Sequence, residues 1–286
     1  MKICRTIEEM RAASRAARQD GRRLGFVPTM GALHAGHISL VRAARQRCDA
    51  VGVSIFVNPT QFGPKEDFSK YPRTFEHDRE LLEAEGVAIL FAPSTEEMYP
   101  RGATTFVTVE GLSEKLCGRS RPGHFRGVAT VVAKLFNIVE PDLAFFGQKD
   151  SAQAVIIRRM VRDLALGVEI VICPIVREPD GLALSSRNAY LDPRQRKQAT
   201  VLYRSLRRVK SLADGGESDA AQLIAAALEV FKEEPEVRLD YFEIVDRETL
   251  DPVADISQGA LVAVAAFVGS TRLIDNIVLH GNSRKP

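Results

Sequence analysis

Hydrophobic residues in the first part of the chain fall in short runs that alternate with amphipathic stretches. The runs are apolar almost throughout, whereas the stretches between them carry apolar residues at helical spacing among charges. The predicted strands are Leu24–Thr29, Val51–Val57, Val87–Phe91, Thr104–Val109, Leu143–Phe146 and Val168–Val176, and the predicted helices are His34–Arg47, Phe75–Glu85, Val128–Val139 and Ala152–Leu164. Apolar strands separated by helices predict a parallel sheet that is covered on both faces.

The second part of the chain, from about Arg177, shows helices first and strands afterwards. Asp192-Pro193 is an N-cap followed by a first-turn proline, and it opens a basic helix that we expect to reach about Leu212. The later elements are a helix at Ala220–Lys232, strands at Tyr241–Val245, Ala260–Val268 and Leu273–Val278, and a hairpin turn at Gly269-Ser270-Thr271. This order predicts a small α+β domain with an antiparallel sheet.

The fold class is therefore α/β. We expect a Rossmann-like parallel-sheet domain over residues 1–176 and a smaller α+β lid domain over residues 177–286. The boundary falls near the turn at Glu178-Pro179-Asp180-Gly181. The length of 286 residues agrees with this, since about 150 residues per domain implies two domains.

Composition and charge exclude several classes of protein. Thirty-nine Lys and Arg against 37 Asp and Glu leave a formal charge of +2, which disfavours nucleic-acid binding and a polybasic membrane anchor. The longest apolar run, Ala260–Val268, is far shorter than the roughly 20 residues that span a bilayer. The N-terminus lacks the apolar segment of a secretory signal. The four cysteines form no CxxC pair and no zinc spacing, so we expect reduced thiols, a cytoplasmic location and no metal held by the protein alone.

Candidate chemistry is concentrated in the turns that follow the predicted strands, where parallel sheets bind ligands. The first such turn, Thr29–His37, leads from a strand into a helix. His34 and His37 lie on one face of the first helical turn, and Gly36 between them leaves room for a ligand. Two imidazoles at a helix N-terminus can donate hydrogen bonds to phosphate oxygens or to a leaving pyrophosphate. The alternative is a pair of surface histidines near a helix start.

Two further turns carry groups suited to phosphate. In Leu184-Ser185-Ser186-Arg187, small hydroxyls precede an arginine whose planar fork matches phosphate oxygens, although a solvated inter-domain loop has the same composition. In Gly147-Gln148-Lys149-Asp150, the glycine permits close approach, the lysine supplies a point charge, and the aspartate caps the next helix or fixes the lysine. A turn with a solvated Lys-Asp pair is the alternative there.

Two polar segments complete the set of candidates. Asn58-Pro59-Thr60-Gln61-Phe62 ends a strand, and its amides can recognise hydroxyl and carboxylate groups, although Asn-Pro is also a common turn opener. The stretch Arg119–Gly127 is basic and rich in Gly and Pro, which suits a cover over an anion as well as an exposed loop. Contact with RNA is disfavoured because Phe125 is the sole aromatic residue among its charges.

These motifs resemble the signature sequences of known enzymes. The pair His34-Ala35-Gly36-His37 and Leu184-Ser185-Ser186-Arg187 resembles the signatures of adenylate-forming nucleotidyltransferases. The longer strings are VPTMGALHAGH, SIFVNPTQF, YPRT, RPGHFRGVATVVAKLFN, FGQKD and DGLALSSRNAYL. They are similar to the pantoate–β-alanine ligase family and follow its order across residues 27–191, and RLIDN near the C-terminus also fits. The resemblance covers essentially the whole chain.

The resemblance implies a reaction in two steps. Pantoate carboxylate attacks the α-phosphate of ATP to give pantoyl-adenylate and pyrophosphate, and the amine of β-alanine then displaces AMP to give pantothenate. It also implies Mg²⁺ bound through phosphate oxygens, with Asp78 as an outer-sphere partner, and a homodimer.

The resemblance assigns roles to individual residues. His37, as proton donor, with His34, Lys149 and Arg187, would act in catalysis. The ATP-binding residues would be Met30, Gly31, Gly36, His37, Gly147, Lys149, Asp150, Val176, Leu184, Ser185, Ser186 and Arg187. Pantoate and β-alanine would be bound by Gln61 and Gln153, with Asn58, Arg121 and His124 around the substrate pocket. Gln148, where the family often has Glu, and Ser151-Ala152, in place of a bulky-polar pair, are departures that bear on affinity.

Two other functions fit parts of the pattern. A nucleotidyltransferase that leaves AMP on its product needs only the histidine and Ser-Ser-Arg motifs, and it leaves Gln61 and Gln153 without a role. A tRNA synthetase-like or other RNA-binding module is disfavoured by the near-zero net charge. A non-catalytic scaffold explains none of the clustering at strand ends.

Overall fold

The protein divides into two units in a computed structural model that describes residues 1–64 and 66–281. The first unit comprises Met1–Ser113, Arg121–Gln148 and Ile156–Pro174, and the second comprises Glu114–Ser120, Lys149–Val155 and the chain from Ile175. The sequence predicts segments 114–120 and 149–155 within the first domain. Their hydrogen bonds explain the difference: Lys115 Nζ binds Asp251, and the Lys149 carbonyl accepts from Asn276, both in the second unit.

The first unit contains a six-stranded sheet in the order β1-β4-β3-β2-β5-β6, and every neighbouring pair is parallel. The strands are β1 (Lys2–Cys4), β2 (Leu24–Thr29), β3 (Ala50–Ile55), β4 (Ile89–Phe91), β5 (Leu143–Gly147) and β6 (Glu169–Cys173). This confirms the predicted parallel sheet. The strand predicted at Thr104–Val109 is wrong: the segment is not paired with any described strand, and the Val107 N–H donates to Thr130 Oγ1 at 2.9 Å.

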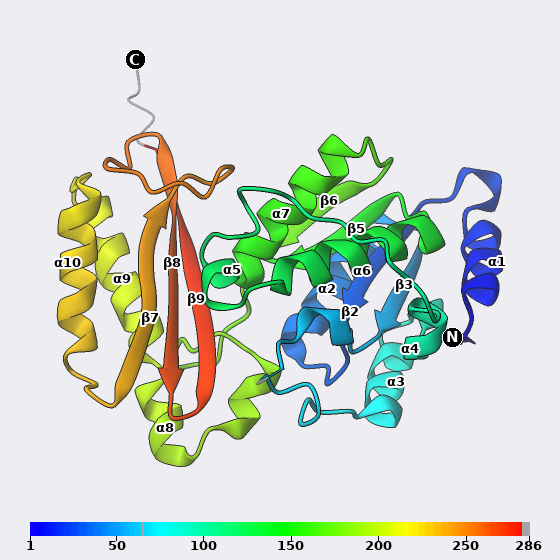
Figure 1. The fold of residues 1–286 in the computed structure, drawn as a ribbon, viewed down its shortest axis with the longest axis horizontal. Helices are drawn as coiled ribbons and strands as arrows, with labels where there is room; N and C mark the ends of the chain where they lie inside the picture. The colour runs from blue at the N-terminus through cyan, green and yellow to red at the C-terminus, as the bar shows by residue number, and fades with distance from the viewer. Residues whose placement is uncertain (65, 282–286) are drawn as a thin grey trace. The chain divides into compact units, whose positions relative to one another are not determined.

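Helices cover both faces of this sheet (Figure 1). They are α1 (Ile7–Ala17), α2 (Ala35–Arg47), α3 (Phe75–Ala84), α4 (Thr95–Met98), α6 (His124–Val139) and α7 (Ser151–Asp163), with short 3₁₀ turns at Gln19–Gly21, Pro59–Gln61 and Gln148–Asp150. Leu40, Val41 and Leu82 of α2 and α3 pack in one core with the strand residues Val27 and Val53. Helices α1 and α6 also contact each other.

The order of the strands reverses between β2 and β5. From β2 the chain continues to β3 and β4 on one side, whereas β6 follows β5 on the other side. The loops after β2 and β5 therefore start next to each other at the carboxyl edge of the sheet, because Gly25 and Phe26 pair in parallel with Leu143 and Ala144. In open α/β sheets this switch point is the usual ligand site.

The second unit contains the antiparallel sheet β7-β8-β9 with α9 and α10 packed against it (Figure 1). Its elements are α5 (Cys117–Ser120), a 3₁₀ turn at Ser186–Tyr190, α8 (Pro193–Gln198), α9 (Val201–Asp214), α10 (Ala220–Phe231), β7 (Val237–Val245), β8 (Gly259–Val268) and β9 (Thr271–His280). The hairpin joins Val268 to Thr271 with Gly269 at φ 58°. This confirms the predicted α+β arrangement.

The basic helix predicted from Pro193 to about Leu212 is two helices in the structure. Thr200 separates them, because both its N–H and its hydroxyl donate to the Lys197 carbonyl, at 3.2 and 2.7 Å. These bonds reach back three residues, and they replace the four-residue hydrogen bonds of a continuous α-helix at that point. Among the described residues no helix combines the length and the apolar character needed to cross a membrane.

Candidate active site

The first turn of α2 carries the two histidines on a capped helix N-terminus. His34 is the N-cap residue; its Nδ1 accepts from the Gly36 N–H at 3.1 Å, and the His37 Nδ1 accepts from the His34 N–H at 3.3 Å. The ring centroids lie 4.1 Å apart. Because each Nδ1 accepts a hydrogen bond, each neutral imidazole carries its proton on Nε2. The Nε2–H groups are thus the donors that this helix end offers to an anion.

The loop between β2 and α2 is held by Asp78, a fully buried carboxylate in the first turn of α3. Asp78 Oδ2 accepts from the Ala32 N–H at 2.9 Å, and Oδ1 accepts from the Leu33 N–H at 2.8 Å and from Thr74 Oγ1 at 3.1 Å. Gly31 has a φ of 82°, which disfavours other residues, and a Cβ there would lie in a tight contact 3.0 Å from Asp78 Oδ2. This carboxylate therefore shapes the loop that leads to the histidines.

Asn58 fixes the amide of Gln61 at the carboxyl end of β3. Asn58 is buried; its Nδ2 donates to Gln61 Oε1 and to the Gly127 carbonyl, both at 3.1 Å, and its Oδ1 accepts from Tyr99 Oη at 2.9 Å. Burial raises the pKa of Tyr99 above its usual 10, which keeps its hydroxyl as a donor. Gln61 Nε2 lies 3.2 Å from Met30 Sδ, so three of the predicted residues meet in this unit.

Arg121 and His124 lie on the other side of Gln61. His124 Nδ1 is 2.9 Å from the Gln61 carbonyl oxygen, and Arg121 Nη1 is 3.0 Å from His124 Nε2. Arg121 also forms a two-pronged ion pair with Glu66 at 2.6 and 2.7 Å. Burial raises the pKa of Glu66, but the Arg121 hydrogen bonds and charge outweigh it, so that pKa lies below its usual 4.5.

In the second unit, Lys149 is anchored through its backbone. Asn276 Nδ2, on β9, donates to the Lys149 carbonyl at 2.9 Å, and Lys149 Nζ lies 3.8 Å from Asp150 Oδ1. The neighbouring Asp275 is buried and binds Arg177 at 2.6 and 2.9 Å. Burial raises the pKa of Asp275, and the Arg177 guanidinium opposes that rise. Gln153 is half-buried in the first turn of α7.

The Ser-Ser-Arg motif follows a tight turn in the same unit. The Leu184 N–H donates to the Val176 carbonyl at 3.0 Å, and β6 ends at Cys173, three residues before the predicted strand end at Val176. Ser185 caps the 3₁₀ turn Ser186–Tyr190 by accepting from the Arg187 N–H at 3.3 Å. A cavity of about 10 Å³ is lined by Lys149, Ser185 and Asp275 among others, which brings two predicted phosphate-binding segments together.

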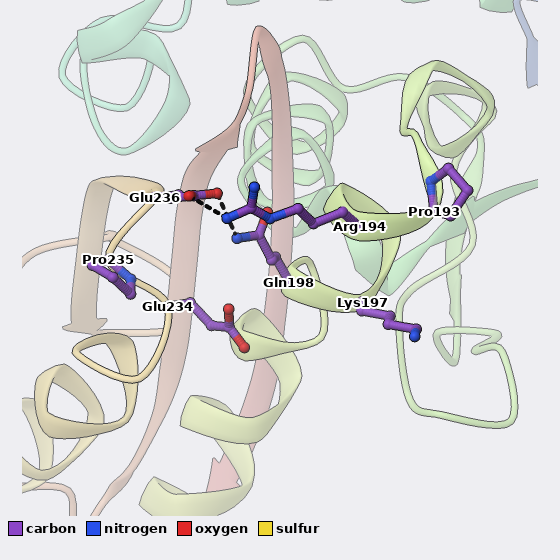
Figure 2. Close-up of a pocket in the computed structure, with 7 residues that line it drawn as sticks. All are labelled: Pro193, Arg194, Lys197, Gln198, Glu234, Pro235 and Glu236. Atoms are coloured by element: carbon purple, nitrogen blue, oxygen red, sulfur yellow. Dashed lines mark hydrogen bonds and ion pairs between the residues drawn. The ribbon is translucent and has the colours of Figure 1, made fainter.

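A larger groove of about 490 Å³ lies on the second unit and is separate from these residues. It runs between α8 and the turn before β7, and Figure 2 shows Arg194 and Gln198 both directed at Glu236. Arg194 binds Glu236, and Gln198 Nε2 donates to Glu236 at 3.0 Å. No residue predicted for the active site lines this groove.

Asp78, which the resemblance suggested as an outer-sphere partner of Mg²⁺, has a structural role in the loop before α2. Its burial and its bonds to backbone N–H groups direct it into the protein, so we do not retain it as an outer-sphere partner of Mg²⁺. Within residues 1–64 and 66–281, no group of three or more His, Cys, Asp or Glu side chains is arranged to hold a metal ion. The four cysteines are unpaired thiols.

Comparison with known families agrees with the sequence motifs. A family model described as pantoate-beta-alanine ligase matches residues 2–278. The chain belongs to the pantoate–β-alanine ligase family. The pantothenate synthetase of Koribacter versatilis is 62% identical over 100% of this chain and 99% of its own length. That of Thermotoga neapolitana is 59% identical over 98% of this chain and 100% of its own length. The resemblance stated from the motifs is confirmed.

Solved structures of pantoate–β-alanine ligases share the fold. Pantothenate synthetase from Thermus thermophilus superposes with a TM-score of 0.92 at 51% identity, covering 97% of this chain and 99% of the other. Pantoate-beta-alanine ligase from Francisella tularensis, complexed with beta-gamma ATP and beta-alanine, gives a TM-score of 0.82 at 34% identity, covering 97% of both chains.

The predicted site residues of this ligase fall into two groups. The first unit holds Met30, Gly31, His34, Gly36, His37, Asn58, Gln61, Arg121, His124 and Gly147, and the second holds Lys149, Asp150, Gln153, Val176, Leu184, Ser185, Ser186 and Arg187. The sequence did not predict the roles of Glu66, Tyr99, Gly127 and Asn276. A glycine inside an apolar helix, as at Gly127, is the one local signal among them.

Proposed function

We infer that this chain is an ATP-dependent ligase that condenses (R)-pantoate with β-alanine to pantothenate, through a pantoyl-adenylate intermediate, with release of AMP and pyrophosphate. The observation that carries this conclusion is the family match over residues 2–278, which includes every motif named above up to the RLIDN string. The Francisella tularensis relative, complexed with beta-gamma ATP and beta-alanine, supports both substrates.

The chemistry explains why a nucleotide is consumed. A carboxylate is a poor acyl donor, and transfer of AMP to it gives the acyl carbon a good leaving group. In the first step a pantoate oxygen bonds to the α-phosphorus while the bond to the β-phosphate oxygen breaks. In the second step the β-alanine nitrogen bonds to the acyl carbon and AMP leaves. The protein mainly orients the reactants and stabilises the charge that develops.

The geometry of the first unit suits charge stabilisation. The Nε2–H groups of His34 and His37, at the positive end of a 13-residue helix, are suited to the phosphates that leave in the first step. His37 is the proposed proton donor. Because its Nδ1 accepts a hydrogen bond, the proton that it donates is the one on Nε2. Met30, Gly31, Gly36 and Gly147 are proposed to line the nucleotide at the switch point.

The second unit is proposed to supply the remaining phosphate contacts. Lys149 and Arg187 would neutralise phosphate oxygens, Ser185 and Ser186 would donate hydroxyls, and Asp150 would bind the ribose. Val176 would contact adenine through its backbone, and Leu184, whose N–H donates to the Val176 carbonyl, would close on the triphosphate together with the Ser-Ser-Arg motif. Gln61, with its amide fixed by Asn58, and Gln153 are proposed to bind pantoate, and Gln61 is proposed to face β-alanine as well.

Further expectations go with this function. Mg²⁺ is proposed to arrive on the ATP phosphates, where it would offset their charge. We propose a homodimer, which light scattering tests against the 31.5 kDa chain mass, and a cytoplasmic location, supported by the four unpaired thiols. We also propose that the second unit acts as a lid; small-angle scattering that is identical with and without ATP plus pantoate would count against a large closure.

A product assay tests the function. With ATP and pantoate, free AMP and pantothenate should form only when β-alanine is added. A stable adenylylated product that β-alanine leaves intact would instead identify a nucleotidyltransferase. AMP formation that is independent of pantoate would contradict both.

A further inference from the structure

Hydrogen bonds hold Gln61 through its backbone as well as through its side chain. The side-chain amide is oriented by Asn58 on one side and by Met30 on the other, at 3.1 and 3.2 Å. The backbone carbonyl of the same residue faces His124 Nδ1 at 2.9 Å. Both ends of the side-chain amide and the backbone carbonyl of Gln61 therefore have partners within the first unit.

The protonation state of His124 follows from its neighbours. Arg121 can only donate, and its Nη1 lies 3.0 Å from His124 Nε2, so Nε2 is the acceptor. The ring proton must then reside on Nδ1, where it donates to the Gln61 carbonyl. Arg121 thus selects the tautomer that holds Gln61, and its own Nη2 reaches the same carbonyl at 3.4 Å.

Glu66 fixes Arg121 in turn. Its two oxygens accept from Arg121 Nε and Nη2 at 2.7 and 2.6 Å, and the two side chains are only 25% and 15% exposed. A two-pronged pair of this kind restricts both the position and the plane of the guanidinium. Arg121 is thereby directed at His124 and not at solvent.

Helix α6 closes the arrangement at Gly127. A Cβ at this position would lie 2.3 Å from the Thr60 carbonyl oxygen and 2.6 Å from Gln61 Cα, so the helix packs directly on the backbone of these two residues. The Gly127 carbonyl also accepts from Asn58 Nδ2 at 3.1 Å. The helix that carries His124 therefore also fixes the position of the Gln61 backbone.

We propose that Glu66, Arg121 and His124 are positioning residues that act on pantoate only through Gln61. Glu66 orients Arg121, Arg121 selects the Nδ1–H form of His124, and His124 holds the Gln61 carbonyl so that its amide meets the pantoate. The proposal rests on the function inferred above. It refines the expectation that Arg121 and His124 contribute around the substrate pocket: His124 and Gln61 line one cavity of about 200 Å³, and Arg121 is not among its lining residues.

The experiment compares His124→Ala with His124→Asn, since an asparagine amide can place a donor near the position of Nδ1. Asn137→Ala, at an exposed position on the same helix, is the matched control. The expected result for His124→Ala is a pantoate KM about tenfold higher, the effect of one lost hydrogen bond, with the ATP KM within about twofold of wild type. His124→Asn should recover most of the loss, and Asn137→Ala should match wild type.

A double-mutant cycle separates positioning from general damage. If His124 acts through Gln61, adding His124→Ala to Gln61→Ala should change the pantoate KM by less than about twofold. Additive effects would overturn the proposal, as would a parallel rise of the ATP KM, an unchanged pantoate KM in His124→Ala, or no recovery in His124→Asn. Should His124→Ala fail to fold, Glu66→Gln is measured in the same way and should raise the pantoate KM alone.

Pantoate binding in the presence of a non-hydrolysable ATP analogue, followed by calorimetry, distinguishes failure of the positioning role from failure of the ligase function. Wild-type binding with weaker binding by His124→Ala supports the proposal. Equal binding by both overturns the proposal and leaves the ligase function standing. A wild-type chain that binds no pantoate overturns both.

Discussion

Replacing Asp78 should loosen the loop that carries the histidine motif. In Asp78→Ala the backbone N–H groups of Ala32 and Leu33 lose their acceptors at 2.9 and 2.8 Å, and Leu33 is only 7% exposed. The loop follows β2 directly, so its displacement reaches Met30 on one side and His34 on the other. The substitution is therefore expected to affect both stability and the first chemical step.

The magnitude follows from those two hydrogen bonds. Each buried donor left without an acceptor costs about 1–3 kcal/mol, and water can reach the half-buried Ala32 N–H more easily than that of Leu33. The substitution also removes a carboxylate whose burial costs free energy, and this offsets part of the lost stability. We therefore expect a net destabilisation of about 3 kcal/mol, or roughly 6–12 °C in Tm, if the first unit unfolds as one transition. Asp78→Asn keeps one acceptor and should cost about half as much.

Thermal unfolding followed by circular dichroism, together with pyrophosphate release from ATP and pantoate, measures both effects. Pyrophosphate release by Asp78→Ala at a temperature where the variant is folded should be slower by about tenfold or more, since small misplacements of catalytic groups are costly. Glu80→Ala, exposed on the same helix, should stay within about 0.5 kcal/mol of wild type. Wild-type stability and wild-type pyrophosphate release in Asp78→Ala would refute the assigned role.

Three other substitutions test separate contacts. Gly127→Ala forces a Cβ against the Thr60 carbonyl, so it should lower the free energy of unfolding in urea by about 1–3 kcal/mol and raise the pantoate KM. An unchanged unfolding free energy and KM would show that α6 can move away from Thr60. Arg177→Met leaves the buried Asp275 carboxyl without its partner and should cost about 3–5 kcal/mol, and unchanged urea unfolding would count against a structural ion pair. His37→Ala should slow pyrophosphate release by about 100-fold or more with the fold intact, and near-wild-type release would remove His37 from catalysis.

The parallel sheet could be predicted because its strands are buried on both faces. Leu24–Thr29 was predicted with the bounds that β2 has, since Pro28 and Gly31 mark its end and the residues within it are apolar. The same reasoning fails where burial and composition disagree. Thr104–Val109 is rich in β-branched residues, yet Phe106 is 41% exposed and stacks with Arg126 at 3.7 Å.

Candidate residues within one local motif could also be predicted. The His34–His37 spacing requires a helix start, and a capped helix is what the structure contains. Their supporting partners could not be predicted, because those contacts join residues far apart in the chain. Asp78 lies 46 residues from Ala32, Glu66 lies 55 from Arg121, and Asn276 lies 127 from Lys149. Only the fold brings such pairs into contact.

The most direct test of the adenylate mechanism is the fate of the pantoate carboxylate oxygens. Pantoate labelled with ¹⁸O in its carboxylate, incubated with the enzyme, ATP and β-alanine, should transfer one ¹⁸O to each AMP released and leave the other in the pantothenate amide. Label in inorganic phosphate, or AMP without label, would contradict formation of a pantoyl-adenylate.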